Sequence, residues 1–305
     1  MFRSARAAAC VAALALFAPA SAFCDPAGFS FLEIPAGARA SGLGGAYASR
    51  AEGAEAAFWN PAGLAAVKGV QVVASHYEFL SHLRYAQFGV AERWLGGGAS
   101  ASLRALYSEP IAERDAIGNQ IGTFGAHDLE MALGYGRDLG EGLRMGGSAQ
   151  IVRERIAEAS ATTWAFNGGA TWDPPRWQGM RLSASAHNLG PAGAFVIDGE
   201  KGAPVPLPAA VQLGGSYGRL AGGLDFRGSL ETRLTRGRPV IGMMGLEAAH
   251  SSGAALRLGL RVKDETTSLS YGAGYGTAGL RLDYAFVPFR LDLGDTHRFS
   301  LGMQF

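Results

Sequence analysis

The chain is short of charge, of cysteine and of long apolar runs. Only 17% of its 305 residues are Asp, Glu, Lys or Arg, against roughly 25% in ordinary soluble domains. This shortage excludes a charge-driven disordered chain and a coiled coil, because both need many more ionic groups. The formal net charge of +1 argues against a nucleic-acid partner, since phosphate neutralisation requires a concentrated basic excess.

Glycine is abundant instead, at 45 of 305 residues, about twice its ordinary share. The glycines have no three-residue period, which excludes collagen. Beyond the N-terminus, no uninterrupted apolar stretch reaches the roughly 20 residues that a membrane helix needs. If the chain enters a membrane, only a closed β-barrel can therefore satisfy its backbone there.

Residues 1–22 have the pattern of a secretory signal peptide. Two arginines precede an apolar run at residues 7–17, and residues 20–22 read Ala-Ser-Ala, a cleavage site. The alternative is a membrane anchor, but the eleven apolar residues of this run fall short of the roughly 20 that would be required. We expect export. Cys10 would leave with the signal, so the mature chain would keep Cys24 alone and form no internal disulfide.

From about Gly69 onward, short runs alternate apolar and polar residues. In residues 256–262 and 280–286, every second residue is apolar and the others are charged or small. A strand places such apolar residues on one face, whereas a helix would scatter them. Turn signals separate fourteen runs, which predict strands near 69–79, 82–92, 98–109, 126–138, 142–156, 161–173, 179–189, 209–219, 222–233, 240–249, 254–263, 267–276, 279–289 and 296–305.

The strand number and the connection lengths favour a membrane barrel. Fourteen is even, and tight connections such as residues 140–141 and 251–252 alternate with long segments such as 110–126 and 190–208. A soluble sandwich or barrel is the alternative, because one buried apolar face gives the same period. Aromatic residues near the run ends favour the membrane. We predict an all-β protein, a transmembrane antiparallel β-barrel of about 14 strands in the bacterial outer membrane.

The segment before the strands, residues 23–68, reads as a compact unit. Three glycines, Gly42, Gly44 and Gly45, permit close backbone approach and positive φ. Residues 51–58 favour a short helix that Pro61 would end, with Asn60 biased toward an extended or turn conformation. This predicts an N-terminal plug (hatch) segment inside the lumen, between the signal peptide (1–22) and the barrel (69–305). The alternative is an extended periplasmic arm.

Eleven charged residues fall opposite the apolar positions of their runs and are predicted to face the lumen. Their mixed signs fit paired charges that pack the lumen or hold the plug, or else a polar pathway through it. The eleven are Arg104, Asp225, Arg227, Glu231, Arg233, Glu247, Arg257, Arg261, Arg281, Asp283 and Arg298.

Motifs that suggest catalysis or cofactor binding lack the necessary context. Residues 214–218 match the G-x-S-x-G pattern, but they lie inside an alternating run rather than at a strand-to-helix turn. Residues 274–279 match G-x-G-x-x-G, but a strand run follows instead of a helix. The six histidines show no metal-ligand spacing. We expect no enzymatic activity, no cofactor and no metal site.

Residues 37–65, GARASGLGGAYASRAEGAEAAFWNPAGLA, resemble the N-terminal signature of the PorV/PorQ family, which is related to the FadL-type transporters of the outer membrane. The resemblance returns at 182–190, 205–217, 282–289 and 293–305. It implies a fourteen-stranded barrel around an N-terminal plug, with a plug motif of Gly42, Gly44, Gly45, Asn60, Pro61 and Gly63. The end of the chain is similar to the signal read by the barrel-assembly machinery, carried by Phe299, Leu301, Met303 and Phe305.

The function implied by this resemblance is passive transport of a small apolar molecule across the outer membrane. The partners would be outer-membrane lipid, the barrel-assembly machinery and the small apolar ligand. The alternative is an accessory or shuttle role in protein secretion and surface attachment of type IX, which some members of the family serve and which would make secreted proteins the partners.

Overall fold

The structure is a computed structural model that describes residues 28–79, 83–290 and 294–305. The predicted signal peptide, residues 1–22, and the first residues of the plug segment lie outside the described residues.

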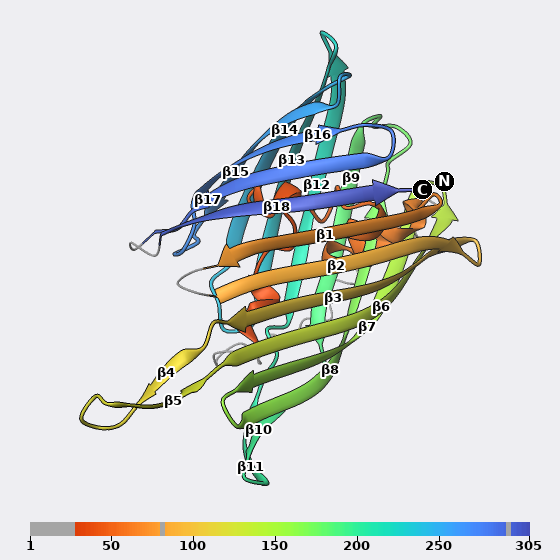
Figure 1. The fold of residues 1–305 in the computed structure, drawn as a ribbon. Helices are drawn as coiled ribbons and strands as arrows, with labels where there is room; N and C mark the ends of the chain where they lie inside the picture. Colours follow the sequence, from red (N-terminus) through yellow and green to blue (C-terminus); the bar gives the residue numbers. More distant parts are fainter. Residues whose placement is uncertain (1–27, 80–82, 291–293) are drawn as a thin grey trace.

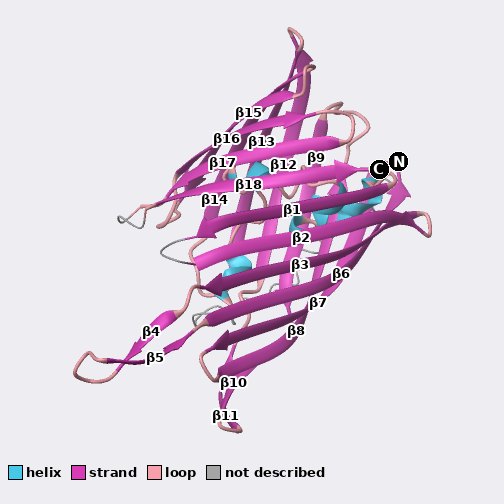
Figure 2. Cartoon of the chain, in the orientation of Figure 1, coloured by secondary structure: helices cyan, strands magenta, loops and turns pink. Residues whose placement is uncertain are grey.

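Fourteen antiparallel strands close into a barrel (Figures 1 and 2). Each strand pairs with the next along the wall, β18 pairs with β1, and β9 pairs with both β8 and β12. The predicted fold class is confirmed. The wall strands are β1 (Val70–Phe79), β2 (Leu83–Trp94), β3 (Gly97–Ser108), β6 (Ala126–Gly140), β7 (Leu143–Ile156), β8 (Ala159–Trp172), β9 (Met180–Leu189), β12 (Ala210–Ala221), β13 (Leu224–Thr235), β14 (Ile241–His250), β15 (Ala254–Val262), β16 (Leu269–Gly276), β17 (Leu280–Pro288) and β18 (Asp295–Gln304).

The two ends of the barrel differ in their connections. At the end where the wall begins and finishes, the Phe305 amide donates to the Val70 carbonyl at 2.9 Å. Most turns there are short, such as Leu95-Gly96 between β2 and β3 and Gly222-Gly223 between β12 and β13. Outer-membrane barrels have short periplasmic turns and longer extracellular loops, so we name this the inner end and the opposite one the outer end.

Two hairpins project from the outer end (Figure 1). The first pairs β4 (Ile111–Arg114) with β5 (Gln120–Phe124), and the second pairs β10 (Gly193–Ile197) with β11 (Glu200–Val205). The sequence predicted long connections at 110–126 and 190–208, and both are long connections between wall strands, but the hairpin pairing within each was not predicted. β4 is exposed along its whole length, whereas Phe195 of β10 and Val205 of β11 pack partly against the core. Neither hairpin has the regular alternation of buried and exposed residues that a wall strand shows.

The barrel exterior is apolar. Outward-facing side chains alternate with lumen-facing ones, and large apolar groups among them are well exposed, including Leu133 at 70% and Ile151 at 62%. Near the inner end, Trp94 and Tyr135 pack edge to face with ring centroids 6.4 Å apart. This arrangement suits a hydrocarbon environment bounded by an aromatic girdle. Among the described residues, no helix has the length and hydropathy needed to cross a membrane.

Residues 28–68 fold inside the barrel (Figure 1, red to orange). They form η1 (Ser30–Glu33), α2 (Ala38–Ser41), η2 (Gly53–Glu55), α3 (Ala56–Trp59) and η3 (Pro61–Ala66). η3 packs on β3, β6, β7 and β8, and α2 packs on β16, β17 and β18. The helix at the end of the 51–58 segment stops at Trp59, and Asn60 is extended with φ −157°, as the Asn60-Pro61 pair predicts.

The apolar core lies between this plug and the wall in two main clusters. The inner cluster surrounds Tyr47, Trp59 and Leu64. The outer cluster joins Phe29 and Phe31 of the plug to wall residues that include Tyr77, Tyr85 and Val152. Apolar contacts with the wall therefore hold the plug in place along most of the lumen.

Candidate functional site

The tightest contact between plug and wall involves the start of η3. A Cβ on Gly146 of β7 would lie 2.3 Å from the Pro61 carbonyl oxygen, and one on Gly136 of β6 would lie 2.4 Å from it. Asn60 is fully buried, and its side-chain oxygen accepts a hydrogen bond from the Ala62 amide at 3.1 Å. Glycine in the wall thus lets a capped turn approach the sheet backbone directly.

The glycines predicted as a plug motif lie at two further close approaches. Gly44 has φ +64°, and a Cβ there would lie 3.0 Å from the Leu260 amide nitrogen on β15. Gly42 faces Gly272 of β16, with 3.0 Å from a built Cβ to its Cα. Gly45 follows with φ +81°. Because glycine has no side chain, the plug backbone can pass close to the barrel wall at these positions.

Gly63 serves the internal packing of the plug. A Cβ at this position would lie 2.0 Å from the Ala51 carbonyl oxygen. The six plug-motif residues are therefore dispersed over several separate contacts and form no single binding site.

An ionic cluster ties the plug to the wall around Glu247 of β14. Its carboxylate pairs with Arg39 of α2 at 3.0 Å, with Arg257 of β15 at 2.5 Å and with Arg50 of the plug. Arg50, Arg257 and Glu247 each have side chains only 3% exposed. The attraction between the three guanidinium groups and the carboxylate offsets the cost of removing these charges from water. The cluster stabilises the protein only when all its members are present, because removing any partner leaves a buried charge unpaired.

The ionic cluster continues to β17 and back to the plug. Arg257 pairs with Asp283 at 2.8 Å, and Asp283 pairs with Arg281 at 2.8 Å. Arg281 then reaches Glu55 of η2 at 2.7 Å, and the Tyr47 hydroxyl donates to the same carboxylate. These contacts start from the plug at Arg39 and Arg50 and return to it at Glu55, so they cross-link the plug to the barrel wall.

Three other wall residues bind the plug backbone or side chains. Glu231 of β13 accepts from the Ser49 amide at 2.9 Å. Arg261 of β15 donates to the Gly44 carbonyl at 2.9 Å, and Arg298 of β18 donates to the Ser41 hydroxyl at 2.9 Å. Together with the ionic cluster, these bonds hold the plug segment between residues 39 and 55.

The remaining lumen candidates differ in role. Arg104 is buried and paired with Glu130 of β6. Asp225 and Arg227 pair with each other at 2.8 Å near the inner end, with side chains 35% and 51% exposed. Arg233 lines a cavity and has no ion pair among the described residues. Of the two readings of these charges, packing and holding the plug accounts for most of them.

The sequence reasoning missed the plug's own charged residues. Arg39, Arg50 and Glu55 supply half of the ionic contacts, yet they lie in a segment with no strand period from which a facing direction could be inferred. The sequence feature that could have identified them is that they are charged residues within a run rich in Ala and Gly.

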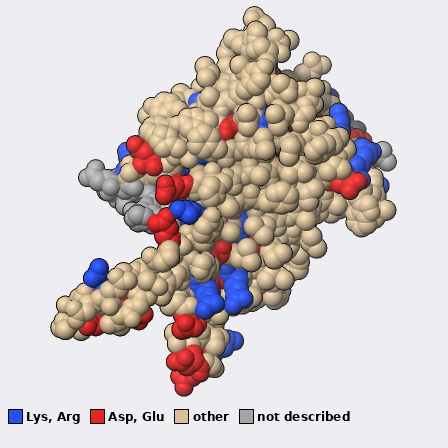
Figure 3. All heavy atoms as spheres, viewed as in Figure 1, with Lys and Arg blue, Asp and Glu red and all other residues tan. Residues whose placement is uncertain are grey.

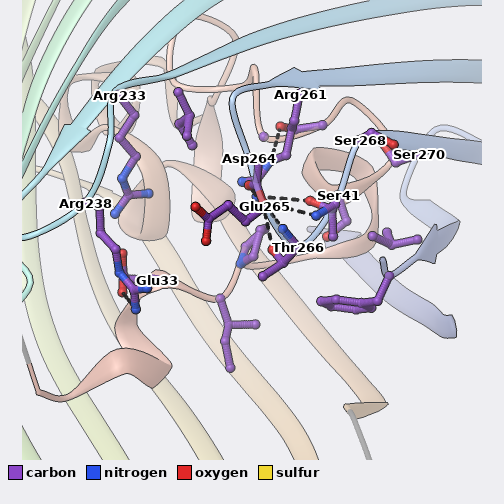
Figure 4. Close-up of a pocket in the computed structure, with 18 of the residues that line it drawn as sticks. Glu33, Ser41, Arg233, Arg238, Arg261, Asp264, Glu265, Thr266, Ser268 and Ser270 are labelled. Carbon is purple, nitrogen blue, oxygen red and sulfur yellow. Dashed lines mark hydrogen bonds and ion pairs between the residues drawn. The ribbon is translucent and has the colours of Figure 1, made fainter. Parts of the chain in front are cut away.

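A cavity of about 410 Å³, which we call the vestibule, lies at the outer end between the plug and the wall (Figure 4). One side is apolar, formed by Phe31 and Ile34 of the plug with Phe79, Leu106 and Phe289 of the wall region. The volume suits a small molecule, and the lining divides into this apolar side and a polar side opposite it.

The other side of the vestibule is polar. Arg238 pairs with Glu33 at 3.2 Å, and Arg261 pairs with Asp264 at 2.7 Å. Asp264 belongs to the β15–β16 loop, where burial acts to raise the pKa of its carboxyl. Arg261 and hydrogen bonds from the loop outweigh this and hold that pKa below its ordinary value. Glu33 and Asp264 are thus each paired with an arginine, and Glu265 of the same loop also lines this side.

A second, much smaller cavity of about 20 Å³ lies deeper. It shares Ile34, Pro35 and Arg233 with the vestibule and reaches Trp59 and His187. The plug residues Ile34 and Pro35 therefore form part of the floor of the vestibule. Neither cavity was identified by the sequence, because each is assembled from segments far apart in the chain.

The residues that suggested catalysis have no catalytic surroundings. Ser216 lies inside β12, opposite Arg181 of β9 and Ser229 of β13. No group of three or more His, Cys, Asp or Glu that could hold a metal is found within the described ranges.

No protein-family model matches the chain, and no curated protein matches it. Solved structures do match. The Pseudomonas putida toluene transporter TodX aligns with a TM-score of 0.59 at 13% identity, covering 92% of this chain and 97% of that one. The CymD monoaromatic hydrocarbon channel aligns with a TM-score of 0.59 at 14% identity, covering 88% and 97%.

A FadL homologue of Pseudomonas aeruginosa aligns with a TM-score of 0.55 at 12% identity, covering 92% of this chain and 99% of that one. At these low identities the superpositions show a shared fold. The chain is a barrel with the fold of FadL-type outer-membrane channels.

Proposed function

We propose that this protein is a passive, non-enzymatic channel of PorV/PorQ type, through which small apolar molecules cross the outer membrane. The observation that carries the proposal is the vestibule, with its apolar wall of plug and barrel residues at the outer end. An apolar solute that enters the vestibule is stabilised by about 25 cal/mol for each Å² of its apolar surface that is removed from water. The plug forms the floor, so onward passage would follow the space beside it.

The fold supports the same class of solute. TodX is described as a toluene transporter and CymD as a monoaromatic hydrocarbon channel. The resemblance of residues 37–65 to PorV/PorQ proteins adds the finer assignment. Toluene is therefore a suitable first probe.

The test is calorimetric binding of toluene to the purified full chain in detergent, followed by uptake of labelled toluene by cells that express it. Leu106→Trp places a large side chain in the vestibule and should weaken binding at least about tenfold, because it fills space that the ligand needs. Leu133→Trp is the matched control, since Leu133 faces outward and is 70% exposed. Equal binding by both variants, or none by the wild type, would contradict the proposal.

The alternative function, an accessory or shuttle role in type IX-like secretion, draws support from the two hairpins β4–β5 and β10–β11, which project from the outer end as a surface for a secreted protein. In the native host, a secretion role predicts that deleting residues 110–124 releases surface-attached proteins into the medium while toluene uptake persists. A channel alone predicts unchanged surface proteins.

A further inference from the structure

A row of side chains crosses the outer end of the barrel wall at one level. Direct cross-strand pairs link Arg84 to Tyr107, Tyr107 to His127, His127 to Arg155, and Arg155 to Ser160. The hairpin strands β10 and β11 extend it, because Ser160 pairs with Val196 and Val196 with Lys201. We call these seven residues the outer row.

The outer row faces away from the lumen. Arg155 lies on the same face of β7 as Ile151, which is 62% exposed, while the intervening Val152 is fully buried against the plug. Arg153 shares this face one step closer to the barrel middle and is exposed. Directly paired residues project to the same side of a sheet, so the other members of the row point outward too.

The height of these arginines matches the edge of the membrane. The outward face of β7 is apolar or small from Leu143 to Ile151, and Arg153 follows ten residues after Leu143. At about 3.4 Å per residue and a tilt of about 40°, this corresponds to roughly 25 Å along the barrel axis. The apolar band of such barrels is about 25 Å tall, so Arg153 and Arg155 lie at the level of the outer headgroups.

Positive charge is in excess at the centre of the outer row. Arg84 is compensated, since it pairs with Glu109 and lies opposite Glu78. Arg155 has one acidic neighbour, Glu158, at 3.8 Å, and this carboxylate is 86% exposed.

Arg153 has no ion pair among the described residues. At the far end, Lys201 is flanked by Glu200 on the opposite face of β11. Figure 3 shows Lys and Arg gathered between the bases of the two projecting hairpins.

We propose that Arg153 and Arg155, with His127 beside them and Lys201 three strands further along the outer row, bind the phosphate groups of an anionic lipid in the outer leaflet. Guanidinium groups bind phosphate with paired, charge-assisted hydrogen bonds, and cationic clusters at headgroup level recognise anionic lipids. The two hairpins lie on either side of the site. The opposite face of the wall is lumen, so the lipid approaches from the bilayer, and this site is independent of the vestibule.

Native mass spectrometry of the full chain in detergent tests the proposal, with bisphosphorylated lipid A as the probe and lipid A stripped of both phosphates as the comparison. The wild type should bind the bisphosphorylated form at least about fivefold more tightly. The double variant Arg153→Gln/Arg155→Gln should lose that preference, and Arg153→Lys/Arg155→Lys should recover part of it. Inorganic phosphate at equal concentration should compete weakly, because it lacks the acyl chains.

Arg137→Gln is the matched control, since Arg137 is an exposed outward arginine at the inner end of the adjacent strand β6. It should bind as the wild type does. Unchanged binding in the Gln double variant, equal binding of the phosphate-free lipid, or an equal loss in Arg137→Gln would each overturn the proposal. Retained heat-modifiable migration on gels shows that a variant is folded, and toluene binding should be unaffected in all of them.

Discussion

Arg50 of the plug and Glu247 of the barrel wall form an ion pair in which both side chains are only 3% exposed. The two residues are 197 positions apart in the chain. Glu247 also holds Arg39 and Arg257, so the stability of the plug and that of the wall are coupled at one carboxylate. In the proposed channel, a solute must pass beside the plug, or this ionic cluster must be released.

Replacing Glu247 with Gln should destabilise the protein markedly. The change leaves Arg39, Arg50 and Arg257 without their shared carboxylate, and breaking a buried pair costs about 3–5 kcal/mol. The thermal transition followed by circular dichroism should fall well below that of the wild type. Asp225→Asn is the control, because it disrupts an exposed pair worth about 0–1 kcal/mol. Similar small shifts for both would show that the ionic cluster does not hold the plug.

Gly146→Ala should displace the plug. The added methyl group would meet the Pro61 carbonyl oxygen at 2.3 Å, and such overpacking costs about 1–3 kcal/mol. Gly168→Ala on the neighbouring strand is the control, because nothing lies within 4 Å of its Cβ. Limited proteolysis should cut the plug faster in the first variant only. Equal protection would mean that η3 does not rest on the glycines of the wall.

The contribution of Asp264 to the folding stability of the protein should depend on pH. The folded-state pKa of its carboxyl is below its ordinary value of 3.8, so the stabilisation is present above that value and is lost as the pH falls through the folded pKa. The difference in thermal stability between the wild type and Asp264→Asn should therefore be constant from about pH 5 to 8 and shrink below pH 3.8. A difference that grows on acidification would contradict the assignment.

Phe305→Ala should reduce the amount of barrel in the outer membrane without changing its stability. Phe305 is 76% exposed and continues the outward face of Phe299, which fits a signal that the assembly machinery reads in the unfolded chain. Quantitative blotting of membrane fractions measures the effect. Phe226→Ala, which removes another outward phenylalanine at 46% exposure, should leave the level unchanged.

Most of the wall could be predicted because its signal is local. Alternation located all fourteen strands, and for residues such as Arg257 and Asp283 the position within a run indicated which face they occupy. The two hairpins were missed because neither shows the regular alternation of buried and exposed residues that marks a wall strand. The binding partners of each charge could not be predicted either, since pairing depends on how distant strands register.

The sequence by itself determined an alternating all-β chain, because the two-residue period of a strand assigns every side chain to one of two faces. It also placed glycine and Asn60-Pro61 where the plug needs close approach and a turn. Only the tertiary structure decided which charges meet, where the vestibule forms and which arginines stand at the membrane edge. These depend on barrel closure, which brings together residues such as Arg39 and Glu247 whose separation in the chain carries no information about their distance in space.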